Sequence, residues 1–481
     1  MKRKLFLFTT FLISVAGLFA FEPMPTEKLL LSYLQNDIDL KKLTIAAEKA
    51  NLSYKTSEID SGIDVTLSTG TLNFKTSKDG LTVKTSPTVK VNIPQASGLS
   101  ISANSTISSA NKDNVLSDST ISVGVDIISP SKLTNDINMM NAERTRTQAI
   151  RNLEEKAIDK EKAFYTEIKS LLNSINSIIQ AEKKLYTDIK DFETIQAKGF
   201  SKTSSTYRLA EIQVSSDKQN IESLKKTFIN DYVLFYKKCG YQIELSSDID
   251  VMTLIPTDII APEPVNIESY DKNYFKELEN AKWTYKINSM KRDVNHNFSL
   301  SANAGYTFDN SMTKSDTLNI GASSTIGGVN LQAGINIPIK EDPYPSFTFS
   351  AGVTPNAFRK NNVKKQQDEL TEQQELLDIK VAENNYDNFV TSSKQTLEEL
   401  YWRQKTTNEN FDMYSELEKD MKEWFELGVV SESEYLSAKT NANLNKVKSI
   451  INDIDFIIYN DDINKKFIKT VKNSNTEVSA I

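Results

Sequence analysis

The chain of 481 residues carries 57 basic and 64 acidic residues and a formal net charge of −7, which argues against a nucleic-acid partner. Cys239 is its single cysteine and His296 its single histidine, so an intrachain disulfide, a His-paired triad and a multi-histidine metal site are excluded. The sequence also contains no Gly-rich phosphate loop and no acidic group with ligand spacing. We therefore predict no enzyme, no cofactor and no metal.

Residues 1–20 have the pattern of a secretory signal peptide. Lys2, Arg3 and Lys4 precede an apolar run, and the small Ala20 stands at the expected cleavage position. No later stretch approaches 18 consecutive apolar residues, so no other spanning helix is expected. The sequence predicts export of the mature chain.

A first structural repeat is expected over residues 21–240. It begins with a helix over 26–60 and continues with a strand block over 64–129, in which apolar and polar residues alternate. A long helix is predicted over 132–197, where apolar residues recur every seven positions, as in a coiled-coil seam. These are Ile150, Ala157, Phe164, Leu171, Ile178, Leu185 and Phe192. A helix over 203–238 and a Pro-containing linker over 241–269 follow.

The same order returns over residues 270–470, which is the second expected repeat. It predicts a helix over 270–294, strands over 298–354, a long helix over 357–427 and a helix over 432–470, before a flexible tail over 471–481. Ser129-Pro130 and Gly199 bracket the first long helix, and Thr354-Pro355 and Gly428 bracket the second. An internal repeat of this kind fixes the architecture early.

The strand blocks leave two questions open. Strands that are apolar on one side and rich in Ser, Asn and Gly on the other suit a transmembrane barrel, although a soluble β-sandwich gives the same alternation. Each block could supply two long strands with a large outer loop, or four shorter strands. At 1.5 Å per residue each long helix extends about 100 Å, well beyond a bilayer. The predicted fold class is an α+β membrane protein with transmembrane β-barrel strands, very long antiparallel coiled-coil helices (an α-barrel) and two repeats.

Over nearly the whole mature chain, these residues resemble the TolC-like outer-membrane efflux proteins. The opening Thr26 to Asp37, the two Pro strand exits and the two Gly turns carry the resemblance. It implies a homotrimer that shares one barrel of twelve strands in the outer membrane, in contact with its lipid, and one helical tunnel in the periplasm. It also implies a periplasmic adaptor (membrane fusion) protein and an inner-membrane transporter as partners.

The resemblance assigns roles to the two turns between helices. Gly199, Phe200 and Ser201 in the first turn, and Gly428, Val429 and Val430 in the second, would form the periplasmic tips where the adaptor docks. Glycine suits such a reversal because it adopts positive φ at no steric cost. The alternative is a helix-capping glycine with no partner.

The resemblance also places a pore constriction near the tips. Glu434 stands six residues after Gly428, where the family carries an acidic residue that forms a ring in the trimer. Ser437 and Ser205 stand where further acidic residues are expected, and Phe425 and Val430 occupy the family's Tyr and Arg latch positions. Three carboxylates in a ring would raise one another's pKa and attract cations.

The leading hypothesis is a passive export duct, the outer-membrane component of a tripartite efflux or export system. The alternative is a coiled-coil structural or adhesive surface protein with a β-rich head. The sequence names neither the cargo nor the particular adaptor and transporter.

Overall fold

A computed structural model describes residues 22–77, 80–94, 96, 98–109, 116–128, 130–296, 298–309, 316–326, 328–339 and 344–468. The expected signal peptide (1–20) and C-terminal tail (471–481) lie outside these residues. The chain divides into two compact units. Unit 1 comprises residues 1–37, 158–265 and 395–461, and unit 2 comprises residues 38–157, 266–394 and 462–481.

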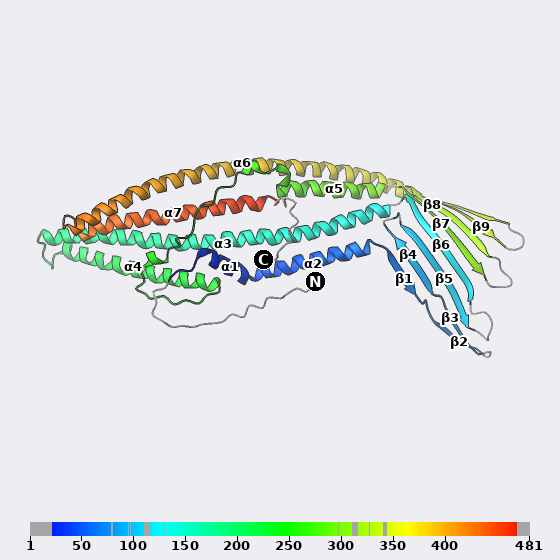
Figure 1. Ribbon diagram of the computed structural model, residues 1–481. Coiled ribbons are helices and arrows are strands. Elements are labelled where there is room, and N and C mark those ends of the chain that lie inside the picture. Colours follow the sequence, from blue (N-terminus) through cyan, green and yellow to red (C-terminus); the bar gives the residue numbers. More distant parts are fainter. Residues whose placement is uncertain are drawn as a thin grey trace. The chain divides into compact units, whose positions relative to one another are not determined.

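Seven α-helices account for most of the described chain (Figure 1). They are α1 (Thr26–Asn36), α2 (Ile38–Asp60), α3 (Pro130–Ala197), α4 (Ser205–Lys238), α5 (Lys276–His296), α6 (Pro355–Glu426) and α7 (Glu432–Lys466). Three short 3-10 helices, η1 (Val251–Leu254), η2 (Ile267–Ser269) and η3 (Lys272–Tyr274), lie between α4 and α5. Two helices exceed the others in length, α3 with 68 residues and α6 with 72.

The helix expected over 26–60 is interrupted at Asp37. The backbone of Asp37 is extended (φ −68°, ψ 121°), and its carboxylate pairs with Lys160 of α3 at 2.6 Å. The preceding residue, Asn36, donates a hydrogen bond from its side-chain amide to the backbone carbonyl of Cys239, which caps α4. The sequence holds no Pro or Gly here, so the break is supported by these long-range contacts. The helix expected over 270–294 begins only at Lys276, because the 3-10 helix η3 occupies the first part of that range.

All ten strand segments form one antiparallel sheet in unit 2. They are β1 (Asp64–Ser68), β2 (Asn73–Ser77), β3 (Gly80–Thr85), β4 (Thr88–Ile93), β5 (Leu99–Ser109), β6 (Leu116–Ile128), β7 (Ser299–Asp309), β8 (Thr317–Ile326), β9 (Val329–Pro338) and β10 (Ser346–Val353). The main path runs β1-β4-β5-β6-β7-β8-β9-β10. The sheet is open within one chain, with β1 and β10 at its two edges.

Four segments of the first block combine into two long interrupted strands. β3 and β4 both pair with β5, and the carbonyl of Pro87 between them accepts from Ser105 of β5 at 3.1 Å, so pairing continues across the interruption. β1 pairs with β4 and β2 with β3, which places β1 and β2 along the same outer edge. Gly70 sits at the break with φ +69°, where a Cβ would clash with Ser86. Each block therefore supplies four long strands, which answers the open choice between two and four.

The helices of unit 2 form a layer in the order α2, α3, α5, α6. Arg146 of α3 lies over the ring of Tyr54 in α2, 4.3 Å from its centroid. The guanidinium of Arg144 in α3 binds both carboxylate oxygens of Glu279 in α5, at 2.5 and 2.8 Å. On the far side of α5, Arg292 pairs with Glu375 of α6 at 2.9 Å. The outer helices of this layer, α2 and α6, adjoin the edge strands β1 and β10 in sequence.

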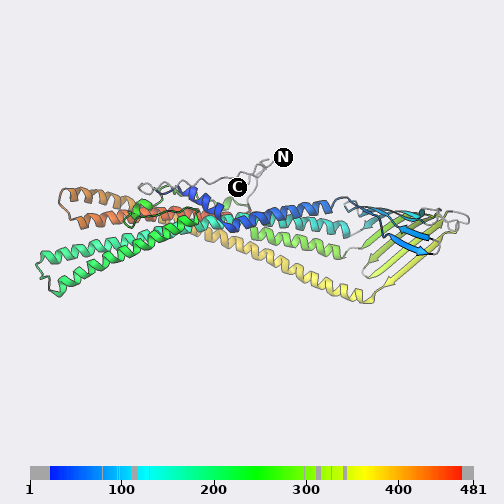
Figure 2. The same ribbon diagram turned by 90° about the horizontal axis from the view of Figure 1, so that it is seen from below.

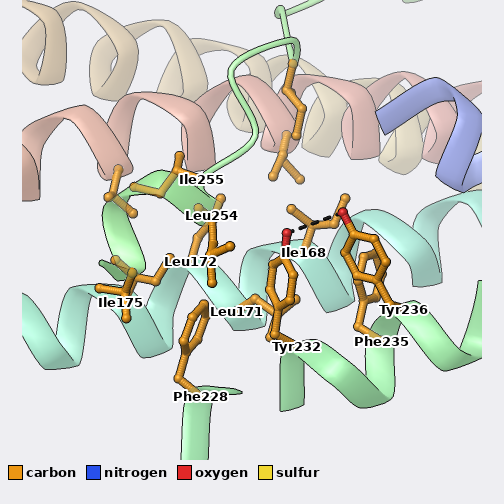
Figure 3. Close-up of a cluster of buried hydrophobic side chains, with 14 of the residues drawn as sticks. Ile168, Leu171, Leu172, Ile175, Phe228, Tyr232, Phe235, Tyr236, Leu254 and Ile255 are labelled. Carbon is orange, nitrogen blue, oxygen red and sulfur yellow. Dashed lines mark hydrogen bonds between the residues drawn. The ribbon is translucent and has the colours of Figure 1, made fainter. Parts of the chain in front are cut away.

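Unit 1 contains the main hydrophobic core (Figure 3). Ile168, Leu172 and Ile175 of α3 face Phe228, Tyr232 and Tyr236 of α4, and η1 covers them with Leu254. The hydroxyl of Tyr236 is shared between the hydroxyl of Tyr232 (3.4 Å) and the backbone N–H of Met24 (3.1 Å). A cavity of about 30 Å³ in this core is lined mostly by apolar side chains, and we ascribe it to packing.

Candidate functional site

The first tip joins α3 to α4 and belongs to unit 1 (Figure 2). Gly199 has φ +76°, and its N–H donates to the carbonyl of Gln196 at 3.0 Å. A Cβ at this position would meet nothing within 4 Å, so glycine is required by backbone conformation and not by close packing. Phe200 is 45% exposed and Ser201 is also exposed. The tip therefore presents an aromatic side chain to solvent.

The second tip joins α6 to α7 and also belongs to unit 1 (Figure 2). Gly428 has φ +71°, its N–H donates to Phe425 at 2.9 Å, and the N–H of Val429 donates to Trp424 at 2.8 Å. These two bonds make a Schellman motif, the usual way to end a helix on a left-handed glycine. Val429 is 70% exposed and Val430 half-buried. Both tips thus end in an open glycine turn that exposes an apolar side chain.

One aromatic pair closes each hairpin next to its turn. In the first hairpin, Phe192 of α3 packs edge-on against Tyr207 of α4, with ring centroids 5.1 Å apart. In the second, Phe425 of α6 stacks on Tyr435 of α7 at 5.5 Å. Tyr207 and Tyr435 were not among the residues expected at the tips. The aromatic residue on each side of a Gly turn was the available signal in the sequence.

Glu434 is already engaged within the single chain. Its carboxylate accepts from the N–H of Ser431 at 3.1 Å, and its own N–H donates to the Ser431 hydroxyl at 3.4 Å. This reciprocal pair is a capping box, readable in the sequence as Ser431-Glu432-Ser433-Glu434. The other carboxylate oxygen accepts from Lys190 of α3 at 2.9 Å. Glu434 therefore links the second hairpin to the first.

The charge environment of Glu434 in one chain differs from that expected for a ring of carboxylates. The hydrogen bond from Lys190, and then those from Ser431, hold the pKa of Glu434 below its ordinary value. Ser437 lies one turn further along α7, and its carbonyl accepts from Thr440 and Asn441. Ser205 is the first residue of α4 and is exposed. A ring formed by Glu434, Ser437 and Ser205 stays a prediction about assembled copies.

A second charged group reinforces the first hairpin. Lys184 of α3 binds Asp188 of the same helix at 2.9 Å and Asp217 of α4 at 2.6 Å. Burial alone would raise the pKa of Asp217, but hydrogen bonding with Asp188 and Lys184 lowers it. This arrangement ties the two helices of the hairpin together by charge.

The sheet has one apolar face and one polar face. The strand register aligns apolar residues across the whole sheet, in a row made of Val65, Val91, Ile101, Val123, Ala304, Ile320, Ile335 and Phe347. The neighbouring row consists of Thr66, Lys90, Ser102, Ser122, Gly305, Asn319, Asn336 and Ser346. Many apolar side chains are strongly exposed, and Phe347 reaches 73%. An apolar face of this extent must be covered by something other than water.

The outer helices of the unit 2 layer carry exposed apolar stripes. In α2 the stripe recurs every seven residues as Ile38, Ile45, Leu52 and Ile59, and all four side chains are exposed. In α6 the same spacing gives Val363, Leu370 and Leu377, which are exposed as well. A seven-residue apolar repeat is the pattern of a helix that packs against another helix. Among the residues that the structure describes, nothing covers these two stripes.

The groups that usually carry chemistry are sparse in the described residues. Cys239 is fully buried, and burial, with a smaller contribution from Glu167, raises the pKa of its thiol to about 12. Within the part of the chain that the structure describes, no group of three or more His, Cys, Asp or Glu side chains could hold a metal ion. No helix in those residues is long and apolar enough to cross a bilayer.

The observed geometry defines a protein of two long helical hairpins and one antiparallel sheet with a single apolar face. Two family models match consecutive parts of the chain, the TP096X N-terminal domain at residues 29–259 and the TP096X C-terminal domain at residues 261–470. The chain is therefore composed of the two domains of the TP096X family, in that order. Their division agrees with the repeated element order of the fold. No curated protein sequence matches the chain.

Several solved structures show a distant similarity. A membrane protein from Pseudomonas aeruginosa is 12% identical, with a TM-score of 0.44, and the match covers 92% of this chain and 89% of that one. The CmeC outer membrane channel of Campylobacter jejuni is 12% identical, with a TM-score of 0.40 and coverage of 92% and 86%. The open MtrE outer membrane channel of Neisseria gonorrhoeae is 10% identical, with a TM-score of 0.40 and coverage of 92% and 88%.

Proposed function

We propose that this chain is the outer-membrane channel of a tripartite efflux or export system. In this proposal three copies form one conduit, with the sheet in the outer membrane and the helices in the periplasm. The cargo would arrive from an inner-membrane transporter through a periplasmic adaptor, and the transporter would supply the energy. The single observation that carries the proposal is the sheet whose apolar face is exposed from edge to edge.

The dimensions and chemistry of the sheet support a place in lipid. The strands β5 to β9 hold 10 to 13 residues each, and about 9 to 11 tilted residues cross a bilayer. One face is apolar across all eight long strands, whereas the other is dominated by Ser, Thr, Asn and Gly. This is the arrangement of a barrel with lipid outside and water inside. A soluble β-sandwich would need a second sheet over the apolar face, and the ten described strand segments all belong to one sheet.

Self-association is supported by the two edges of unit 2. The stripe on α2 stands at one edge of the helical layer and the stripe on α6 at the other. A ring of copies would bring α2 of one copy against α6 of the next and cover both stripes at once. Such a contact between two different edges is heterologous, and it closes into a ring when the rotation between copies permits.

The tips support the docking of an adaptor. Phe200, Val429 and the strongly exposed Leu427 place apolar side chains on turns that are held in shape by glycine, capping and aromatic pairs. Exposed apolar side chains on a rigid turn are the kind of anchor that a partner protein can bind. The docking residues we assign are Gly199, Phe200, Ser201, Gly428, Val429 and Val430.

Conductance across a planar bilayer tests the proposal. Purified protein should form channels, and a Glu434→Gln variant should show reduced cation selectivity if the carboxylates ring the pore. Gln preserves the capping hydrogen bonds and removes the charge, and Glu432→Gln in the same helical turn is the matched control. Protein that fails to conduct, or that salt washing releases from membranes, would contradict the channel. Equal selectivity in both variants would contradict the role of Glu434 alone.

A further inference from the structure

The number and direction of the long strands determine how copies can be joined. The sheet is a continuous antiparallel succession, in which β1 with β2 forms the first long strand and β10 the eighth. Because eight is even, the first and last strands run in opposite directions. The free edge of β10 can therefore pair with the free edge of β1 in another copy and preserve the antiparallel order. An unpaired edge with exposed apolar residues, such as Val65 in β1 or Phe349 in β10, is a template for pairing.

Closure of the eight strands within one chain fits the side chains poorly. An eight-stranded barrel is narrow, and side chains must fill its interior. The polar face here includes Gly124, Gly305, Gly321, Gly334 and Gly352, which leave the middle of the sheet without bulk. A face of this kind suits the wall of a wide, water-filled space.

The helical layer and the sheet occupy similar arcs of a ring. Four helices packed side by side at about 9–10 Å occupy roughly 40 Å of circumference. Eight strands spaced by about 4.8 Å and tilted by about 40° occupy roughly 50 Å. A ring that closes through the helices can therefore carry a barrel to which each copy contributes all eight strands.

We propose that copies of this chain pair β1 with β10 and form one shared barrel with eight strands from each copy. The inference rests on the trimer of the proposed function, in which it gives twenty-four strands, twice the twelve implied by the resemblance. A barrel of that size has a backbone diameter of about 50 Å. The outlet is thus much wider than that of a twelve-stranded barrel.

The inner face of this barrel is nearly uncharged in its second half. The strands β7 to β10 contain a single charged residue, Asp309, at the end of β7. The hydroxyls of Ser301 and Ser323 bond to each other at 2.6 Å across two of these strands. Such a wall offers hydrated hydroxyl and amide groups but little field to select ions. Charged residues of this face belong to the first half of the sheet, where Lys90 pairs with Ser102 and Asp126 with Ser301.

Cysteine pairs placed in the edge strands test the pairing in the full-length protein, in a Cys239→Ala background. One cysteine replaces Val65 or Leu67 of β1 and the other replaces Phe347 or Phe349 of β10, all on the apolar face. We expect oxidation to link separate chains up to a closed trimer. Pairs that combine Thr66 with Phe347 face opposite sides and serve as the matched control, which should not cross-link. Linkage within one chain would overturn the shared barrel.

A second pair of cysteines, placed in two helices, distinguishes a wrong strand pairing from a wrong conduit. Cysteines at Leu52 of α2 and Leu370 of α6 test copy-to-copy contact through a bis-maleimide. If the helix pair links copies and the strand pairs do not, the wide barrel is wrong and the conduit stands. If neither links copies, both proposals are wrong.

The width is tested by access to the polar face. Asn319→Cys in β8 should react in intact outer membranes with a maleimide that carries a long polyethylene glycol chain. Ile320→Cys, its neighbour on the apolar face, should resist the same reagent because lipid covers it. If Asn319→Cys reacts with a small maleimide and not with the long one, the outlet is narrow and the proposal is overturned.

Discussion

Two helices of this chain carry the same seven-residue apolar pattern and differ in what covers it. In α3 the middle of the stripe is buried, with Phe164 and Ile178 at 0% exposure in the core of unit 1. In α2 the stripe of Ile38, Ile45, Leu52 and Ile59 is exposed in unit 2, up to 76% at Ile59. The pattern predicts that a helix will be covered. It does not say whether the cover belongs to the same chain.

The largest loss of stability is expected for a substitution in the buried stripe of α3. Phe164→Ala in α3 should lower the free energy of unfolding by about 3–5 kcal/mol, because it removes a fully buried ring and leaves a cavity. Urea unfolding followed by circular dichroism measures the loss. Ile45→Ala in the exposed stripe is the matched truncation, and in the dissociated chain it should change stability by less than about 0.5 kcal/mol. Equal losses of stability would contradict the claim that only the α3 stripe is covered within the single chain.

A substitution in the exposed stripe of α2 should impair assembly of the copies and not the stability of the single chain. Leu52→Asp in α2 should leave the helix content of the single chain unchanged and prevent copies from joining, since a charge cannot enter an apolar seam without a partner. The mass of the particle in detergent, measured by analytical ultracentrifugation, checks this. Glu48→Asp, on the same helix but outside the stripe, should assemble normally. If Leu52→Asp assembles like the wild type, the α2 stripe is not a seam.

A smaller effect is expected at the two tips, and it should be similar at both. Gly199→Ala and Gly428→Ala should each cost about 1 kcal/mol, because alanine is strained at positive φ although no atom lies in its way. Thermal unfolding of each variant gives the comparison. A much larger loss at one tip would mean that this turn is packed in a way that the single chain does not show.

The smallest effect belongs to the ion pair between the hairpins. Lys190 and Glu434 are partly exposed, so a double-mutant cycle should give a coupling energy smaller than the cost of either glycine substitution. The folded-state pKa of Glu434 is lowered, so its contribution is present above its unfolded pKa and is lost as pH falls through the lower folded value. In Lys190→Met this acid-side loss should shrink. An unchanged profile would show that Ser431 alone holds the carboxylate.

The sequence was sufficient for the repeated order of elements, because alternation, seven-residue periodicity and the Pro and Gly positions are local signals. It was insufficient where contacts between distant residues decide. The break at Asp37 depends on Lys160, and the merging of β3 with β4 into one long strand depends on pairing with β5 across Pro87. At the tips, the turns were predictable from glycine. The capping box of Glu434 could have been predicted from the local sequence Ser431 to Glu434. Its hydrogen bond from Lys190, 244 positions away, has no local signal in the sequence.

Channel formation in planar bilayers, compared between the wild type and Leu52→Asp, tests the central claim most directly. The claim is that copies of this chain cover one another's stripes and thereby form a conduit. It predicts steady channels from the wild type and none from the variant at equal protein concentration. A wild type that never conducts, or a variant that conducts equally well, would contradict it.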